Sequence, residues 1–300
     1  MSKDWMIKDW TTGELNALVK NCGQEVARRI QQGGVRVIIE DIIKKLFDKH
    51  GRRIPESLRN NVCDANNRDF RLNQPKLDTE ADFTNRILRL HGCLSIDTEV
   101  TAQQLKVETE RLLALIRENS QIANITNGVC LPVVLPQLVT DDLGAELELY
   151  LAGVANSYTK TFGDRKFFNH RKGTLANKVS VVGGSRHDQL TRRMKHGSVI
   201  GLHFPNPLQG FSIYADREQV STLPEGFILS GIDTPIAMVM YPDVLARDYS
   251  TPCLDMAALQ WQTAVYSLYF EASGGALDFG FAGVLPLARG SYSGGLLFLG

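Results

Sequence analysis

The sequence VCLPVVLP at residues 129–136 marks the point where the chain changes from a helical to a β-like pattern. It combines β-branched side chains with two prolines, which remove backbone donors, so it predicts a short edge or loop-like strand. Before it, apolar residues recur every three or four positions, whereas after residue 175 they form short runs bounded by Gly, Pro, Asn or Asp. We therefore expect the α+β class: a helical N-terminal third, residues 1–125, followed by a mixed, mainly antiparallel β-containing region, residues 126–300.

Four helices are predicted before residue 125. The first follows a capping box at Thr11–Glu14 and continues to Gly33. Closely spaced apolar residues between Val35 and Phe47 predict the second. The third is expected from residue 78 or 79 to residue 92, and the fourth from residue 98 to residue 118, because each carries an apolar stripe with a helical period.

The region after residue 136 mixes both patterns. Asp141 and Asp142 precede apolar residues spaced by four up to Tyr158, which predicts one more helix with an aspartate cap. Short β-like runs then predict strands at residues 199–204, 211–214, 227–229 and 236–241. Residues 254–270 fit either pattern, and we expect a helix over their first half.

The C-terminal segment, residues 272–300, contains eight glycines among many large apolar side chains. Leaving those side chains in water would be costly, since burying each one is worth roughly 1.5–3 kcal/mol. We therefore expect strands that are integral to the fold, with glycine at bends, bulges or close backbone approaches. If one of these strands lies at an edge of the sheet, it could pair with a neighbouring copy of the chain. A short apolar arm before the first helix could also contact such a copy. The predicted interface residues are Trp5, Trp10, Phe279, Phe281 and Phe298.

The overall composition is that of an ordinary globular protein. Lys and Arg together number 33, as do Asp and Glu, so the net charge indicates neither a nucleic-acid nor a membrane partner. The first residues lack the apolar core of a secretory signal, and the charge-free stretches are too short to span a bilayer. The five cysteines stand at least 30 positions apart, which predicts reduced thiols in a cytoplasmic protein rather than a disulfide framework.

Motifs that carry chemistry are absent from the sequence. It has no phosphate-binding loop, dinucleotide fingerprint, zinc-protease motif, serine-hydrolase elbow or calcium loop. The histidines at 170, 187, 196 and 203 are spaced by 17, 9 and 7 positions, which matches no metal-ligand pattern. We therefore predict no catalytic residue, cofactor or metal ligand and favour a non-enzymatic role, although a site assembled from distant residues stays open.

Charge is unevenly distributed along the chain. Residues 160–196 hold ten Lys and Arg against two acids, whereas residues 197–300 hold nine acids against three arginines and contain no lysine. The basic segment at 165–196 predicts nucleic-acid or anion binding, because its cations are interleaved with aromatic rings that could stack on bases. The predicted binding residues are Arg165, Lys166, Arg171, Lys172, Arg186, Arg192 and Arg193.

Two functions are consistent with these patterns. Opposite charges on one molecule and the apolar termini favour a self-associating structural or assembly subunit of a larger complex, such as a phage particle or a secretion apparatus. Its partners would be copies of itself and other protein subunits. The alternative is a protein that binds nucleic acid or a phosphate ligand through residues 165–196, and this alternative includes an enzyme.

Overall fold

The computed structural model describes residues 11–32, 44–68, 70, 72–248 and 251–300. Contacts within the chain divide it into two units, residues 1–43 and residues 44–300. The described helices of the first unit are α1 (Thr12–Cys22) and α2 (Gln24–Gln31), separated by Gly23 with a φ of 83°. Thr11 and Glu14 form the predicted capping box. The helix predicted between residues 35 and 47 lies largely outside the described residues.

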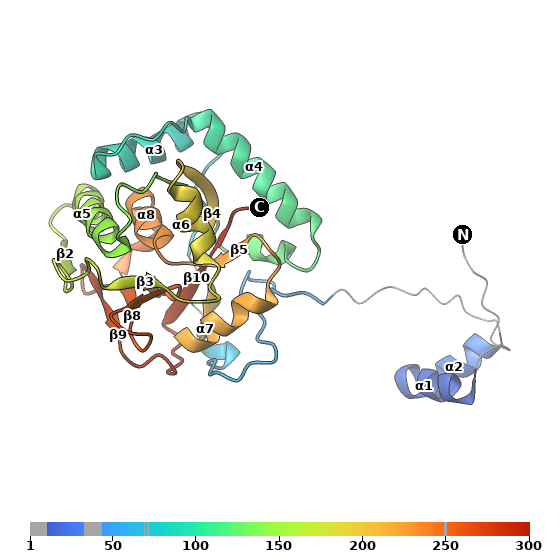
Figure 1. Cartoon of the computed structure of the whole chain (residues 1–300). Helices are drawn as coiled ribbons and strands as arrows, with labels where there is room; N and C mark the ends of the chain where they lie inside the picture. Colours follow the sequence, from blue (N-terminus) through green and yellow to red (C-terminus); the bar gives the residue numbers. More distant parts are fainter. Residues whose placement is uncertain (1–10, 33–43, 69, 71, 249–250) are drawn as a thin grey trace. The chain divides into compact units, whose positions relative to one another are not determined.

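The second unit is built on a mixed sheet of eight strands, in which most neighbours are antiparallel (Figure 1). Its order is β1 (Leu131–Leu135), β4 (Val199–Gln209), β10 (Tyr292–Phe298), β6 (Cys253–Asp255), β8 (Ser267–Ser273), β9 (Ala276–Ala282) and β2 (Lys166–Asn169). The eighth strand, β5 (Phe227–Leu229), also pairs with β10. The β10–β6 and β9–β2 pairs are parallel. A separate antiparallel ladder joins β3 (Val179–Val181) to β7 (Leu259–Trp261).

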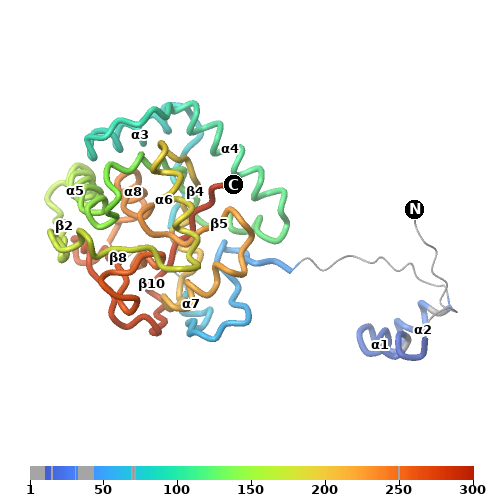
Figure 2. Tube along the Cα trace, in the orientation of Figure 1, coloured from blue at the N-terminus to red at the C-terminus, as the bar shows by residue number. Residues whose placement is uncertain are grey.

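Helices pack on both faces of this sheet. The helices α3 (Glu80–Leu94), α5 (Leu143–Phe162), α6 (His187–Met194) and α8 (Asp233–Met240) lie on one side of β8 and β10, and α7 (Ile213–Gln219) lies on the other (Figures 1 and 2). Apolar side chains form one core on each face, and α4 (Ala102–Glu118) contributes to both. The short helices are η2 (Ala65–Asn67), η3 (Ala123–Asn127), η4 (Val220–Thr222) and α9 (Pro242–Leu245). The expected α+β class is confirmed.

The helices predicted from residues 78, 98 and 141 are present, and each begins at a residue whose side chain caps it. The side chains of Thr79, Thr101 and Asp142 cap α3, α4 and α5 by accepting backbone N–H bonds from the first turn. In the packed unit, α3 contacts α5 and α4 contacts β4. Contacts therefore place α3 and α4 in the same unit as the sheet.

Three secondary-structure predictions in the C-terminal half are wrong. The strand predicted at residues 236–241 is instead part of α8, all of whose residues are buried. Burial on every side leaves an apolar run without a helical period, which resembles a strand. The strand predicted at residues 211–214 overlaps the start of α7, where the Ser212 hydroxyl accepts the N–H of Ala215. The helix expected in the first half of 254–270 is replaced by β6 and β7, which pair with β10, β8 and β3.

The glycine-rich C-terminal segment supplies the middle of the sheet. Strand β10 pairs with β4 on one edge and with β5 and β6 on the other. A β-carbon on Gly294 would overlap the carboxylate of Asp216, and one on Gly295 would lie 2.9 Å from Ser230 Oγ. Successive residues of a strand face opposite sides, so each glycine admits a polar side chain to a different face of β10. Side chains that approach the strand therefore require glycine at both positions.

Candidate functional site

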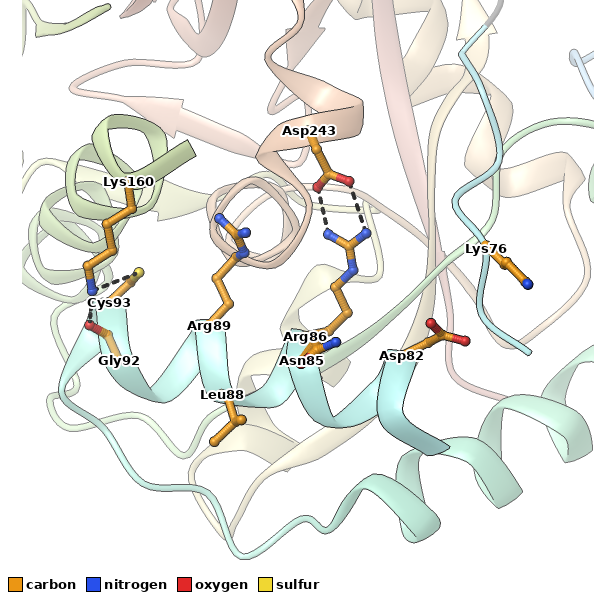
Figure 3. A pocket seen from close by; sticks show the side chains of 10 residues that line it. All are labelled: Lys76, Asp82, Asn85, Arg86, Leu88, Arg89, Gly92, Cys93, Lys160 and Asp243. Atoms are coloured by element: carbon orange, nitrogen blue, oxygen red, sulfur yellow. Dashed lines mark hydrogen bonds and ion pairs between the residues drawn. The ribbon is translucent and has the colours of Figure 1, made fainter. Parts of the chain in front are cut away.

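A cleft with a volume of about 590 Å³ runs along α3, within the size range of small-molecule sites (Figure 3). Its wall is completed by side chains from α5, α9 and the segment before α3. At the N-terminal end of α3, the cleft is lined by Lys76 and Asp82, and the lysine lowers the pKa of Asp82 after the larger effect of the Thr79 hydrogen bonds. These opposite charges leave this end of the cleft close to neutral.

An ion pair crosses the middle of the cleft. Arg86 donates two hydrogen bonds to the Asp243 carboxylate, at 2.6 and 2.9 Å, and a third to the carbonyl of Met240 at 3.0 Å. Its guanidinium also lies 4.5 Å from the ring centre of Tyr241. Burial would lower the pKa of Arg86, but the hydrogen bonds and charge of Asp243 raise it. Arg86 and Asp243 therefore neutralise each other and join α3 to α9.

The C-terminal end of the cleft is positive. Arg89 donates to Thr161 Oγ1 at 2.5 Å, and Lys160 donates to the carbonyl oxygen of Gly92 at 2.7 Å. Gly92 follows Arg89 by about one helical turn, so both contacts join α3 to α5 near the same end of α3. Figure 3 shows the contact of Lys160 with Gly92.

Four cations and two acids line the cleft. Burial would raise the pKa of Asp243, but its pair with Arg86 and, to a smaller extent, the charge of Arg89 lower it. Arg89 and Lys160 therefore bring an excess of positive charge to this end.

A smaller pocket of about 130 Å³ lies on the α7 face of the sheet. The strand register aligns Gly294, Asp255 and Tyr269 on β10, β6 and β8, and paired residues direct their side chains to the same face. Asp255 and Tyr269 line the pocket. Asp216 projects from α7 into the space that Gly294 leaves open. The two aspartates are close enough for their charges to interact.

Neither of these aspartates has the partners that a buried carboxylate needs. Asp216 and Asp255 are 0% and 2% exposed, and both oxygens of Asp216 and Oδ1 of Asp255 have no hydrogen-bond partner among the residues that the structure describes. Burial raises the pKa of Asp216 well above its ordinary value; the charge of Asp255 adds to this, and Arg217 opposes it. Burial also raises the pKa of Asp255 to about 8, against the charges of Arg217 and Arg289. Asp255 is therefore mostly protonated at neutral pH, and burial favours the uncharged form of Asp216 as well.

Another buried polar cluster lies on the opposite face of β10. His203 Nδ1 contacts Asp233 Oδ2 at 2.8 Å, and Ser230 Oγ lies 3.5 Å from the same nitrogen. A Ser-His-Asp triad needs the serine and the aspartate on opposite ring nitrogens. All three side chains are also at most 1% exposed. The shared nitrogen and the burial assign this cluster to the structure of the core rather than to catalysis.

Asp233 has the satisfied environment that the first two aspartates lack. Besides the contact with His203, it accepts the N–H of Gly231 at 2.6 Å. Burial would raise the pKa of Asp233, but the interactions with His203, the charge of His187 and this N–H hold it below its ordinary value. Burial lowers the pKa of His187, and the charge of Asp233 opposes that effect.

The seven predicted anion-binding residues occupy two places in the second unit. Arg165, Lys166, Arg171 and Lys172 lie on or beside β2, whereas Arg186, Arg192 and Arg193 lie on or just before α6. Figure 1 shows these two elements apart from each other. Arg186 donates to three backbone carbonyls, and the guanidinium of Arg171 lies 5.0 Å from the centres of two aromatic rings. Both arginines therefore stabilise the fold, and the other five residues are divided between β2 and α6.

The predicted interface residues have different surroundings. Trp5 and Trp10 lie outside the described residues. Phe279 and Phe298 are 0% and 5% exposed and pack inside the cores of the chain itself. Their burial removes them from any surface that a neighbouring copy would contact. Phe281 is 37% exposed and remains at the surface.

Burial also accounts for part of the uneven charge distribution. Three of the nine acids after residue 196, Asp216, Asp233 and Asp255, are at most 2% exposed. A fourth, Asp243, is paired with Arg86 in the α3 cleft. Most other residues of this region are buried in the sheet and its covering helices, where lysine is rarely found. The excess of acids in the sequence therefore does not correspond to an equally acidic surface.

Sequence reasoning missed the residues that line both cavities. Asp255 had a recognisable signal, because it is a single acid within the apolar run at residues 253–259. Arg89 and Lys160 had none, since they are 71 positions apart and meet only through the packing of α3 on α5. Among the described residues, no group of three or more His, Cys, Asp or Glu is placed to hold a metal ion. In the same part of the chain, no helix is long and apolar enough to cross a membrane.

Comparison with known proteins adds no relative: no protein-family model, curated protein or solved structure matches this chain.

Proposed function

We propose that this protein binds an anionic ligand of the phosphate-bearing class at the C-terminal end of the α3 cleft. The observation that carries the proposal is the meeting of Arg89 and Lys160 at one end of a cleft of about 590 Å³. Hydrogen bonds from such groups to an anion are charge-assisted, and they are about twice as strong as neutral ones. The proposal retains the phosphate-ligand alternative derived from the sequence and moves its site from residues 165–196 to α3 and α5.

The charges of the cleft also favour one orientation of the ligand. The Arg86–Asp243 pair in the middle offers both donors and acceptors, and the Lys76–Asp82 end is close to neutral. An anionic group at Arg89 and Lys160 would therefore leave a polar, uncharged part of the ligand along the rest of α3. A nucleoside diphosphate has this distribution of charge and serves as the probe.

Calorimetric titration of ADP and of a short single-stranded oligonucleotide tests the proposal. The double variant Arg89→Ser, Lys160→Ser should weaken ADP binding at least tenfold. The matched control, Lys166→Ser with Lys172→Ser beside β2, removes the same amount of charge and should leave binding unchanged. Loss of binding in the control alone would return the site to residues 165–196. Absence of binding to the unaltered protein, at low and at high salt, would refute the function.

Self-association is a second candidate, favoured by a group of exposed apolar side chains at the ends of β8 and β9. Val265, Phe281, Val284 and Leu287 are 52%, 37%, 63% and 46% exposed. Neighbouring exposed apolar groups are typical of protein interfaces. A structural or assembly subunit that contacts copies of itself through this group would have a particle mass above 33.3 kDa. Light scattering should then detect that mass, and Val284→Ser should reduce it.

We also propose a cytoplasmic location. All five cysteines are unpaired, and Cys93, Cys130 and Cys253 are buried. Unpaired buried thiols are typical of proteins that fold under reducing conditions. Titration of thiols in protein freshly extracted under denaturing conditions should find five free groups, and a lower number would argue against this location.

A further inference from the structure

We propose that the pocket beneath α7 binds a small neutral polyhydroxyl ligand, of the sugar or polyol class, through the carboxyl group of Asp255, with Asp216 packed behind it. The proposal goes beyond the anion site on α3, because it uses the opposite face of the sheet and none of the same residues.

The unpartnered oxygens are the first reason. Buried polar atoms in folded proteins almost always have a hydrogen-bond partner, so each exception needs an explanation. Asp255 is 98% buried, lines the pocket and has one unpartnered oxygen, and Asp216 behind it has two. A ligand that brings a hydrogen-bonding group into the pocket would provide a partner for the Asp255 carboxyl.

The construction of the sheet is the second reason. Asp216 comes from α7 and Asp255 from β6, where it pairs with Gly294 of β10. A side chain at position 294 would overlap the Asp216 carboxylate, so only glycine there lets the two aspartates approach each other. Replacing either aspartate by an apolar residue would remove an unsatisfied group from the core. Retaining such groups at a cost in stability is typical of binding sites.

Charge then selects the class of ligand. Burial raises the pKa of both carboxyl groups, so it favours the protonated, uncharged form of each. An ammonium group or a metal ion would have to displace these protons, and it would also meet the Arg289 guanidinium, which lines the same pocket. A carboxylic acid both donates and accepts a hydrogen bond, as does a hydroxyl group of the ligand.

The walls of the pocket match the other surfaces of such a ligand. The rings of Tyr269 and Tyr292 lie 6.1 Å apart, and Phe281 and Leu287 complete an apolar rim. Aromatic rings that pair an apolar face with a polar tip suit ligands whose C–H and O–H groups alternate. The volume of about 130 Å³ admits one small ring or a short polyol chain rather than a polymer.

Saturation-transfer NMR on the full chain, with a panel of hexoses, pentoses and linear polyols, tests the proposal. Butylamine, magnesium chloride and benzoate are included as probes of other ligand classes. At least one neutral member of the panel should bind saturably to the unaltered protein. Asp255→Leu should weaken that binding at least tenfold. Asp255→Asn should weaken it less than fivefold, since an amide keeps one donor and one acceptor. The control Asp164→Asn, at an exposed site, should change nothing.

Several results would overturn the proposal. Saturable binding of the amine, the metal ion or benzoate without any neutral ligand would show that another chemistry occupies the pocket. An equal loss in Asp255→Asn and Asp255→Leu would show that a charge is required. If no member of the panel binds, the pocket is a feature of packing. If the variants change only the particle mass, the pocket belongs to a self-association surface. ADP titrations of the same variants should be unaffected, which separates failure here from failure of the anion site.

Discussion

Replacing Asp255 by Asn should stabilise the protein, and the gain should grow with pH. The pKa of this carboxyl is about 3.8 in the unfolded chain and about 8 in the folded one. A group whose pKa is raised by folding contributes stability below the unfolded value and loses it as pH rises toward the folded value. The loss amounts to about 1.4 kcal/mol per pH unit, or about 4 kcal/mol between pH 3.8 and pH 7. Asparagine does not titrate, so the variant escapes this loss.

Urea unfolding at pH 4, 6 and 7.5 measures the effect. The free energy of unfolding of Asp255→Asn should match that of the unaltered protein at pH 4 and exceed it by about 4 kcal/mol at neutral pH, as an upper value. The exposed control Asp164→Asn should stay within about 0.5 kcal/mol at every pH. A variant that is less stable throughout, or a difference that does not change with pH, would refute the reasoning that the carboxyl is buried, unpartnered and uncharged.

Three further predictions follow from single contacts. Asp233→Asn should lower stability by about 3 kcal/mol at neutral pH, because it breaks the buried hydrogen bonds of Asp233 with His203 and Gly231. Since the folded pKa of Asp233 is lowered, the loss should shrink in acid, and urea unfolding at both pH values would detect a failure. Gly294→Ala should cost about 1–3 kcal/mol through overlap with the facing aspartate, whereas Gly183→Ala, with no atom within 4 Å, should cost far less in thermal unfolding. Arg186→Ser should lower the melting temperature by several degrees, and Arg193→Ser, which is exposed, should not; equal shifts would contradict the structural role of Arg186.

The helices around the N-terminal half could be predicted because their signals are local. Thr79, Thr101 and Asp142 each combine a capping side chain with an apolar stripe three or four residues apart, and the structure uses all three caps. The burial of the C-terminal segment could also be predicted, because leaving its apolar side chains exposed to water would cost roughly 1.5–3 kcal/mol for each. The helix starts and the burial of the C-terminal segment could therefore be predicted from residues that are neighbours in the sequence.

Periodicity failed where burial is complete. Every residue of α8 is buried, so its sequence has no polar face to reveal the helical period. Most residues of β6 and β7 are buried as well, and only the pairing of these strands with distant strands determines their conformation. The same burial hides Asp216, Asp233 and Asp255 from the surface, which is why a charge count along the sequence overestimates the acidity of the folded molecule.

The cavities could not be predicted, because tertiary packing alone creates them. Arg89 and Lys160 lie in unrelated stretches, and neither stretch resembles an anion-binding motif. Asp216 and Asp255 are brought together by the parallel pairing of β6 with β10 and by the seating of α7 over Gly294. Parallel pairing between strands 37 or more positions apart leaves no signature in the local sequence.

A crystal structure of the full chain grown with ADP would test anion binding in the α3 cleft most directly. The diphosphate should lie at the C-terminal end of the cleft, with phosphate oxygens within about 3.2 Å of the Arg89 guanidinium and the Lys160 ammonium. A diphosphate bound beside β2 or α6, or a cleft without bound ADP at a concentration that saturates binding in solution, would contradict it.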